Sequence, residues 1–323
     1  WTQEQRPFFS PTVAANLAIH PDTPRPSWER TEKRMNKCKL KHRSDLKVQD
    51  WYKFRHAETR TEQIMAGSEN NYPVNPSIDR VRCNHLSTER FVRQYERTCT
   101  PVVLMGCADH WLARTNWTFE ALLKKYANTL FKCGEDDEGY KVKIKLKYFL
   151  EYLTKQQDDS PMYVFDNSFD EHPVAKALMQ DFDVPKYFRE DLFSLVGEKP
   201  RPPYRWWLIG PKRSGTGVHI DPLGTSAWNT LVRGRKRWVL FPPGINKQVV
   251  KGRSFIKPGE DDEAIDYFTT ILPRIKNALK NSGLPVLDFI QYPGDTIFVP
   301  GKWWHAVLNI DDTVAITQNF CSR

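Results

Sequence analysis

GTGVHIDPLGTSAWNTLVRGRKRWVLF, residues Gly215 to Phe241, is the stretch that most constrains the fold of this 323-residue chain. Its pattern predicts consecutive strands that carry the pair His219 and Asp221. Side chains two residues apart in a strand point to the same face, so these two could bind one ion. The distal run PGDTIFVPGKWWHAVLN supplies a candidate third ligand, His305.

Two imidazoles and one carboxylate form the set that non-haem Fe(II) oxygenases use, because it leaves metal positions open for a co-substrate and O2. The His-X-Asp triplet is weak by itself, since roughly 0.4 such triplets are expected by chance at ordinary Asp usage. Three further features favour a metal site. His219 and Asp221 lie on the same face of a predicted strand, a Gly-rich lead-in over 210–217 precedes them, and the distant His305 follows a Pro-Gly turn. No Ser-His-Asp order, P-loop or CxxC zinc pattern competes with it.

A second feature of this stretch is the dipeptide Arg233-Gly234, which separates two strand patterns. If it forms a two-residue hairpin turn, Asn229 and Lys236 lie on one face of adjacent strands, inside a barrel. A buried Lys needs an anionic partner, which a dicarboxylate co-substrate would supply. The alternative is a longer turn with Lys236 pointing outward beside its neighbouring arginines, because Arg is a poor first residue for this turn.

The rest of the chain favours a mainly β protein with surrounding helices. Ser87 and Thr118 can cap amphipathic helices, and the acidic start and basic end of 260–281 predict a helix that Pro273 kinks. Many short strands separated by Gly and Pro are typical of a sandwich or jelly-roll barrel. The predicted strands are 101–106, 141–147, 163–165, 206–209, 296–299, 306–309 and 313–320.

Charge and cysteine usage bear on partners and compartment. The net charge of +9 suits an acidic partner such as RNA, or a basic surface that only keeps the protein soluble. Segment 25–47 and the alternating KVKIKLK at 141–147 carry Lys-rich faces, each of which either binds phosphates or is plainly solvated. Six cysteines without a CxxC pair predict a reducing, intracellular setting, and no apolar run of about 18 residues predicts a membrane span.

Longer motifs carry a resemblance to a known family. They are FKCGEDDEGYKVKIKLKYFLEYL, DDSPMYVFD, EKPRPPYRWWLIGPKRSGTGVHIDPLGTSAWN and PGDTIFVPGKWWH. Through them, over about residues 45–319, the chain resembles the JmjC-domain 2-oxoglutarate oxygenases, and the lysyl hydroxylases among them. The resemblance implies a cupin-like jelly-roll, the double-stranded β-helix of the JmjC fold, over about 165–323 with a helical insertion at about 258–283. This would lie in a catalytic unit of residues 85–323, after a basic N-terminal arm and helical segment over 1–84.

The resemblance also implies a site and a reaction. Fe(II) would be held by His219, Asp221 and His305, and 2-oxoglutarate by Lys236, Thr216, Asn229, Tyr163 and Thr317. With O2, such a site hydroxylates carbon, and the expected activity is lysyl 5-hydroxylation of Arg/Ser-rich splicing or chromatin proteins. The alternatives are an N-methyl demethylase of histone arginine or lysine, and a non-catalytic module that binds RNA or protein.

The same resemblance sets the expected partners. They are basic protein substrates such as splicing factors or histones, single-stranded RNA, and a second copy of the chain in a homo-oligomer, with no membrane contact. The expected location is the nucleus, with the cytoplasm as a second compartment.

Overall fold

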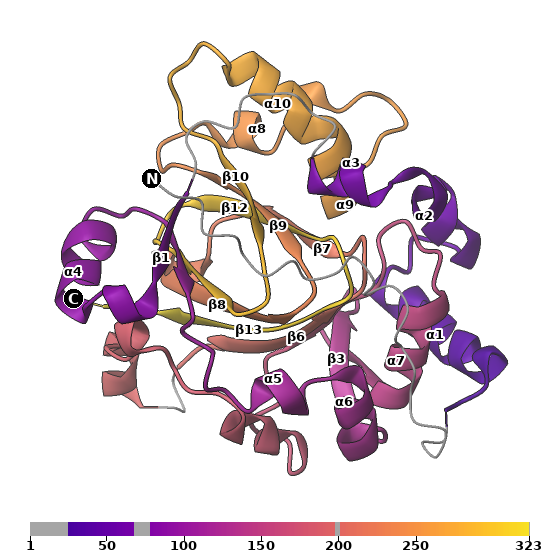
Figure 1. Ribbon diagram of the computed structural model, residues 1–323. Helices are drawn as coiled ribbons and strands as arrows, with labels where there is room; N and C mark the ends of the chain where they lie inside the picture. Colours follow the sequence, from indigo (N-terminus) through magenta and orange to yellow (C-terminus); the bar gives the residue numbers. More distant parts are fainter. Residues whose placement is uncertain (1–24, 68–77, 198–200, 323) are drawn as a thin grey trace.

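The computed structural model describes residues 25–67, 78–197 and 201–322. At its centre two β-sheets face each other and form the expected double-stranded β-helix (Figure 1). The larger sheet has the order β1-β2-β11-β8-β13-β6-β5 and the smaller sheet the order β10-β9-β12-β7. The larger-sheet strands are β1 (Asp79–Arg82), β2 (Val102–Met105), β5 (Val164–Asp166), β6 (Arg205–Gly210), β8 (Ser226–Arg233), β11 (Asp295–Val299) and β13 (Thr313–Phe320). The smaller-sheet strands are β7 (Gly215–His219), β9 (Lys236–Phe241), β10 (Leu287–Gln291) and β12 (Trp304–Asn309).

Strand β13 lies between β8 and β6, and both of its faces are covered. Val314 and Ile316 pack into the large cluster shared with the surrounding helices, whereas Ala315 packs inside the β-helix against Leu208 and Leu231. Because side chains alternate along a strand, Thr317 shares the inner face with Ala315. The inner face of the larger sheet therefore carries small and polar groups, which leaves room for a cavity.

Helices that precede the β-helix in sequence cover the outer face of the larger sheet. Ser87 and Thr118 cap two of them as predicted, each accepting a hydrogen bond from the backbone N–H three residues on. They are α1 (Trp28–His42), α4 (Thr88–Phe91), a π-helical turn (Val92–Glu96), α5 (Ala113–Asn116), α6 (Phe119–Tyr126) and α7 (Leu146–Lys155). The short helices α2 (His56–Thr59) and α3 (Glu62–Ala66) lie elsewhere: Met65 of α3 packs with Val239 of the smaller sheet, and His56 of α2 bonds to Asp266. Short 3-10 turns lie at Val48–Tyr52, Cys83–His85, Ala175–Gln180, Lys186–Phe188, Leu192–Val196, Pro222–Gly224 and Arg253–Phe255.

The Lys-rich stretch 141–147 is a strand only in its first part. β4 (Lys141–Lys145) pairs with β3 (Leu130–Glu135) in a two-stranded sheet, with Val142 and Ile144 buried and its lysines exposed. The chain then turns into α7 at Leu146. The predicted alternation is therefore correct for β4, and the prediction of a strand over the last two residues is wrong because Leu146 is buried in a helix.

Between β9 and β10 the chain forms a helical layer over the smaller sheet (Figure 1). It contains α8 (Lys247–Val250), α9 (Ala264–Asp266), a π-helical segment (Tyr267–Ile271) and α10 (Leu272–Leu279). Pro273 lies one residue into α10, directly after the π-helical segment, so the chain stays helical through the proline and changes helix type beside it. Phe268 and Leu272 from this layer pack with Val239 of β9 and Leu308 of β12.

The predicted hairpin at Arg233-Gly234 is wrong. β8 belongs to the larger sheet and β9 to the smaller one, so the turn carries the chain from one sheet to the other. Gly234 has φ +75°, and a Cβ there would lie 2.5 Å from the backbone oxygen of Asp312. Lys236 nevertheless points inward and is 1% exposed, because β9 is packed on both faces. The prediction that Lys236 is buried is therefore confirmed, but the strand pairing from which it was inferred is wrong.

Replacing Gly234 by Ala is expected to destabilise the fold strongly. A left-handed non-glycine residue costs about 1–2 kcal/mol, and overpacking against backbone adds about 1–3 kcal/mol. Gly244→Ala is the matched control, because Gly244 has φ +88° and a Cβ added there would meet no atom of the described residues within 4 Å. Urea unfolding should show a larger loss for Gly234→Ala than for Gly244→Ala; equal losses would contradict the close approach of the turn to Asp312.

One cysteine pair departs from the reduced state expected from the sequence. Cys83 and Cys107 form a disulfide with a Cα–Cα distance of 5.7 Å. The spacing of 24 residues between them matches no sequence motif and gave no signal of pairing. Within the described ranges, no helix is long and apolar enough to cross a bilayer.

Candidate metal centre and co-substrate site

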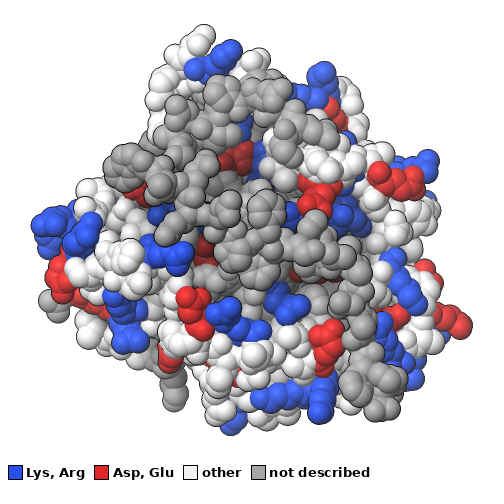
Figure 2. Space-filling model, in the orientation of Figure 1, with Lys and Arg blue, Asp and Glu red and all other residues white. Residues whose placement is uncertain are grey.

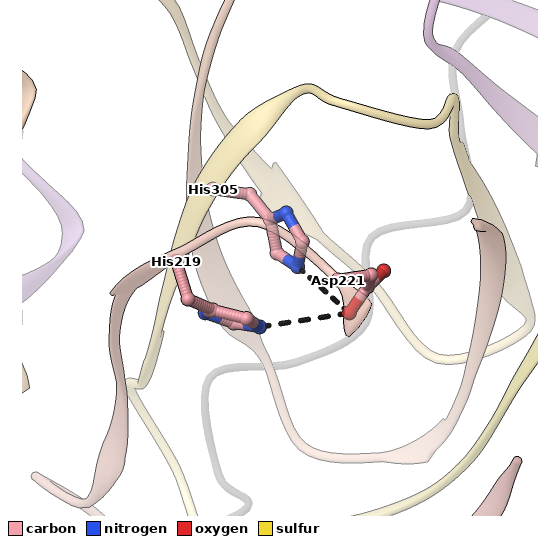
Figure 3. A group of neighbouring side chains, drawn as sticks. All are labelled: His219, Asp221 and His305. Atoms are coloured by element: carbon pink, nitrogen blue, oxygen red, sulfur yellow. Dashed lines mark ion pairs between the residues drawn. The ribbon is translucent and has the colours of Figure 1, made fainter. Parts of the chain in front are cut away.

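The three predicted metal ligands meet at the open end of the smaller sheet. β7 ends at His219, Asp221 precedes a short 3-10 turn, and β12 pairs with β7 so that His305 lies opposite His219. The Nε2 atoms of His219 and His305 lie 3.7 Å and 3.9 Å from Oδ1 of Asp221. Figure 3 shows both imidazoles turned toward this carboxylate. One ligand atom from each residue lies within 4.8 Å of the others, a spacing that one ion can bridge.

Backbone carbonyls orient the two imidazoles. Nδ1 of His219 lies 2.8 Å from the Gly217 oxygen, and Nδ1 of His305 lies 3.1 Å from the Trp303 oxygen. A proton on each Nδ1 satisfies these contacts and leaves the Nε2 lone pair free for a metal. Burial, with His219 alongside, lowers the pKa of His305 to about 4, so this ring is neutral at physiological pH. This set of two nitrogens and one oxygen fits Fe(II) and leaves coordination positions for a bidentate co-substrate and O2.

Lys236 supplies a cation deeper in the β-helix. Its ammonium donates a hydrogen bond of 2.8 Å to the Tyr163 hydroxyl. Burial alone lowers the pKa of Lys236 to about 7, and burial raises the pKa of Tyr163. A buried ammonium without a carboxylate partner is costly, so this position favours an anionic ligand. The far carboxylate of 2-oxoglutarate would supply the negative charge that this pair lacks and could accept hydrogen bonds from both Lys236 and Tyr163.

The other predicted co-substrate residues line the same interior from separate strands. Thr317 of β13 lies opposite Asn229 of β8 and donates to the Trp228 backbone oxygen at 2.8 Å. Thr216 lies on β7 and lines the cavity that opens beside the triad. The sequence reasoning missed Gln291, which is fully buried and donates to both oxygens of Asn229. No motif surrounds Gln291, and its role depends on the pairing of β10 with β9.

The cavity beside the triad has a volume of about 870 Å³. Tyr163, Thr216 and Pro222 line it, and Pro222 directly follows the predicted ligand Asp221 in the chain. Its wall carries an excess of carboxylates that the sequence did not reveal, because they come from distant segments. They are Asp50, Glu135, Asp159, Asp261, Glu263 and Asp266, and the cationic side chains on the same wall are Arg43, Lys53, Lys132 and Arg201.

Binding of 2-oxoglutarate is expected to weaken at alkaline pH. The co-substrate carboxylate binds the protonated ammonium, and the pKa of Lys236 is about 7 in the free protein. Below this pH the group is already charged and affinity is level; above it, the apparent Kd rises by up to about tenfold per pH unit. Anaerobic calorimetry across this range measures the effect, with Lys236→Met as the variant that loses the pH dependence. An affinity that stays constant above neutral pH would contradict the assignment.

Comparisons with known proteins identify the family. The JmjC domain, hydroxylase model matches residues 206–320, which hold the triad and Lys236. The bifunctional arginine demethylase and lysyl-hydroxylase psr-1 of Caenorhabditis elegans is 44% identical over 296 residues, covering 92% of this chain and 72% of that protein. This chain belongs to the JmjC family. The resemblance seen in its longer motifs is therefore confirmed, together with the jelly-roll fold.

More distant JmjC relatives agree on the chemistry. The lysine-specific demethylase JMJ21 of Arabidopsis thaliana is 38% identical over 251 residues, which cover 77% of this chain and 26% of that protein. The 2-oxoglutarate and iron-dependent oxygenase JMJD4 of Mus musculus is 26% identical over 259 residues, covering 73% of this chain and 59% of that protein. This JmjC chain is accordingly a 2-oxoglutarate-dependent oxygenase that uses iron.

Proposed function

We propose that this JmjC oxygenase hydroxylates lysine side chains of basic proteins, with Arg/Ser-rich splicing or chromatin proteins as the substrate class. The observation that carries the proposal is the excess of carboxylates over cationic side chains, six against four, on the wall of the cavity beside the triad. An excess of carboxylates favours a cationic side chain over an acidic one. The similar protein psr-1 carries both lysyl-hydroxylase and arginine demethylase in its name, which supports this activity and its runner-up.

Glu263 is the carboxylate best placed to receive a lysine ammonium. It is held by Ser160 at 3.0 Å and by Arg43 at 3.1 Å, and both of those residues also line the cavity. Burial raises the pKa of Glu263, so its charge is incompletely compensated by these partners. A cationic substrate would restore that compensation and align its own side chain along the cavity.

Different residues of the chain have different roles in the proposed reaction. His219, Asp221 and His305 hold the metal, and Lys236 with Tyr163 holds the far carboxylate of 2-oxoglutarate. Fe(II) and 2-oxoglutarate, when bound, supply the activated oxygen that replaces hydrogen on a substrate carbon. On an unmodified lysine the alcohol is stable. On an N-methyl group the hydroxylated carbon would leave as formaldehyde, which makes arginine or lysine demethylation the second candidate.

Matched peptides separate these two activities. Arg/Ser-rich peptides with unmodified lysine are expected to gain one oxygen on lysine, detected by mass spectrometry, and methylated versions to release less formaldehyde. Glu263→Gln should raise the KM for the lysine peptide about tenfold. This is the effect of losing one charge-assisted contact between the carboxylate and the lysine ammonium, worth about 1.4 kcal/mol. Glu260→Gln is the control, because Glu260 lies in the same loop and pairs with Arg274 outside the cavity. Formaldehyde release without lysine oxidation would overturn the proposal in favour of demethylation.

A basic groove supports a second candidate, binding of single-stranded RNA. It has a volume of about 340 Å³ and runs between α1 and the strand β4. Figure 2 shows Lys and Arg side chains on the α1 and α2 side of the molecule, interspersed with carboxylates. The basic residues that line the groove are Arg30, Arg34, Lys37, Lys41, Lys141, Lys143, Lys145 and Lys147. Their spacing on two facing elements suits a phosphate backbone better than a single solvated face does.

RNA binding at this groove has a distinct salt signature. Lys143→Gln is expected to weaken binding of a single-stranded oligonucleotide and to lower the slope of log K against log salt by about 0.7. Lys280→Gln, at the end of α10 and outside the groove, is the control. Fluorescence anisotropy at several salt concentrations measures both; equal effects of the two variants would remove the groove as the RNA site.

The same basic helix α1 would also serve nuclear import. Imaging of the tagged chain with and without the α1 charges tests this.

A further inference from the structure

Two free thiols meet where α1 crosses the two-stranded sheet. Cys38 lies on the buried face of α1 and is 8% exposed, and Cys133 lies on β3 and is 2% exposed. The two thiols lie within interacting reach of each other, and each shifts the pKa of the other. Each sulfur also lies near a β4 carbonyl, Cys38 at 3.9 Å from Lys143 and Cys133 at 3.6 Å from Val142. The pair thus joins two elements that are far apart in sequence, and neither the metal site nor the proposed lysine contact uses it.

The two sulfurs differ in access. Cys38 lines the basic groove between α1 and β4, so a small polar molecule can reach it from solvent. Cys133 lies behind it and lines the wall of the acidic cavity. A reagent entering the groove therefore meets Cys38 first, with Cys133 on the neighbouring strand behind it. This arrangement of one reachable thiol and one resolving thiol is typical of redox-sensitive pairs.

Electrostatics activates the reachable member. The hydrogen bond from Cys133 lowers the pKa of Cys38, and the charges of Lys41, Lys37 and Arg34 lower it further against the effect of burial. The same hydrogen bond, with burial, raises the pKa of Cys133. Cys38 is therefore the more acidic thiol of the pair, and the thiolate in an electropositive, partly accessible place is the reactive form of cysteine.

We propose that Cys38 and Cys133 form a peroxide-reactive dithiol, in which Cys38 is oxidised first and Cys133 closes a disulfide between α1 and β3. The Cys38 thiolate attacks one oxygen of hydrogen peroxide, the O–O bond breaks, and the products are a sulfenic acid and hydroxide. The Cys133 sulfur then attacks the Cys38 sulfur, the S–O bond breaks, and the hydroxide leaves as water with the Cys133 proton. Overall two thiols lose two electrons and one peroxide is reduced to two waters.

Oxidation of this pair would act next to the active-site cavity. α1 ends at His42, whose ring lies 2.8 Å from the Glu135 backbone oxygen of β3. The following Arg43 pairs with Glu263, the carboxylate proposed to bind substrate. A disulfide would fix α1 on β3 immediately before these contacts. The dithiol itself rests on the groove and the thiol contact, independently of which substrate the cavity takes.

Peroxide titration of the reduced chain tests the proposal. A few equivalents of peroxide are expected to give a linked Cys38–Cys133 peptide, which mass mapping distinguishes from the Cys83–Cys107 link. Cys99 is the internal standard, because it is a free and exposed thiol. Cys38 should be consumed at least about tenfold faster than Cys99 at neutral pH, because Lys41, Lys37 and Arg34 lower the pKa of Cys38 and so raise its thiolate fraction. Equal rates at the two thiols, or oxidation of Cys38 without a link to Cys133, would overturn the proposal.

Two variants assign the roles within the pair. Cys133→Ser should leave a Cys38 sulfenic acid that dimedone traps, and Cys38→Ser should remove the fast reaction altogether. Lys37→Gln with Lys41→Gln should slow Cys38 oxidation at neutral pH, with the rate recovering at alkaline pH, which a purely structural role of these lysines does not predict. Unchanged oxidation rates in the charge variant, or a fast reaction that persists in Cys38→Ser, would contradict the mechanism.

Discussion

Asp221→Ala is expected to abolish 2-oxoglutarate turnover while leaving the fold intact. Asp221 is the carboxylate that both triad imidazoles face, at 3.7 Å and 3.9 Å from its Oδ1. Loss of an outer-shell partner of a metal ligand already costs about 10–100-fold in affinity or activity, so loss of the ligand itself should exceed about 100-fold. Release of CO2 from 2-oxoglutarate, with and without added Fe(II), measures the effect.

The matched control removes a carboxylate that does not face the imidazoles. Asp312 lies in the turn before β13 and accepts a hydrogen bond from the Lys212 backbone N–H. Asp312→Asn keeps that acceptor and should turn over 2-oxoglutarate at the normal rate. If Asp221→Ala retained more than about a tenth of normal CO2 release with unchanged metal binding, the triad assignment would be wrong.

Lys236→Met is expected to weaken 2-oxoglutarate binding by about two to three orders of magnitude. Truncating one partner of a buried, hydrogen-bonded charge pair costs about 2–5 kcal/mol, or roughly 30-fold to several thousandfold in Kd. Lys236 is 1% exposed, so its loss would leave the bound carboxylate buried without its cation. Calorimetric titration with 2-oxoglutarate under anaerobic conditions measures the loss.

In the absence of 2-oxoglutarate, Lys236→Met should leave the stability of the protein unchanged or raise it. Without co-substrate the Lys236 charge has no carboxylate partner among the described residues, and burial lowers its pKa. Met fills a similar volume without a charge, so thermal unfolding of the free variant should occur at the same or a higher temperature. Lys247→Met, on the exposed helix α8, should change neither quantity. A free variant that unfolds earlier, with normal 2-oxoglutarate affinity, would make Lys236 structural.

Local patterns predicted those parts of the fold that local physics determines. The strand at 313–320 matches β13 at both ends, and Ser87 and Thr118 cap the helices predicted for them. The alternation predicted over 141–147 is confirmed for β4 (Lys141–Lys145) and is wrong from Leu146, where α7 begins. In each case the pattern of buried side chains, or the cap hydrogen bond, lies within the element itself.

Pairing between distant segments was the part that the sequence did not determine. A glycine turn such as Arg233-Gly234 predicts a reversal of the chain, but not whether the next strand joins the same sheet. Asn229 and Lys236 face one interior because their two sheets face each other, and not because their strands pair. The acidic cavity wall and the Cys38–Cys133 contact likewise arise only when α1, β3 and the 261–266 segment come together.

Labelled oxygen tests the central claim most directly. A lysine-containing basic peptide, Fe(II), 2-oxoglutarate and 18O2 are incubated with the chain, and the peptide is mapped by mass spectrometry. One 18O atom is expected on a lysine side chain, together with CO2 release, and neither should occur with Asp221→Ala. Release of CO2 with no labelled lysine on any peptide of the panel, in a protein that binds metal normally, would contradict the assignment of lysine as the oxidised residue.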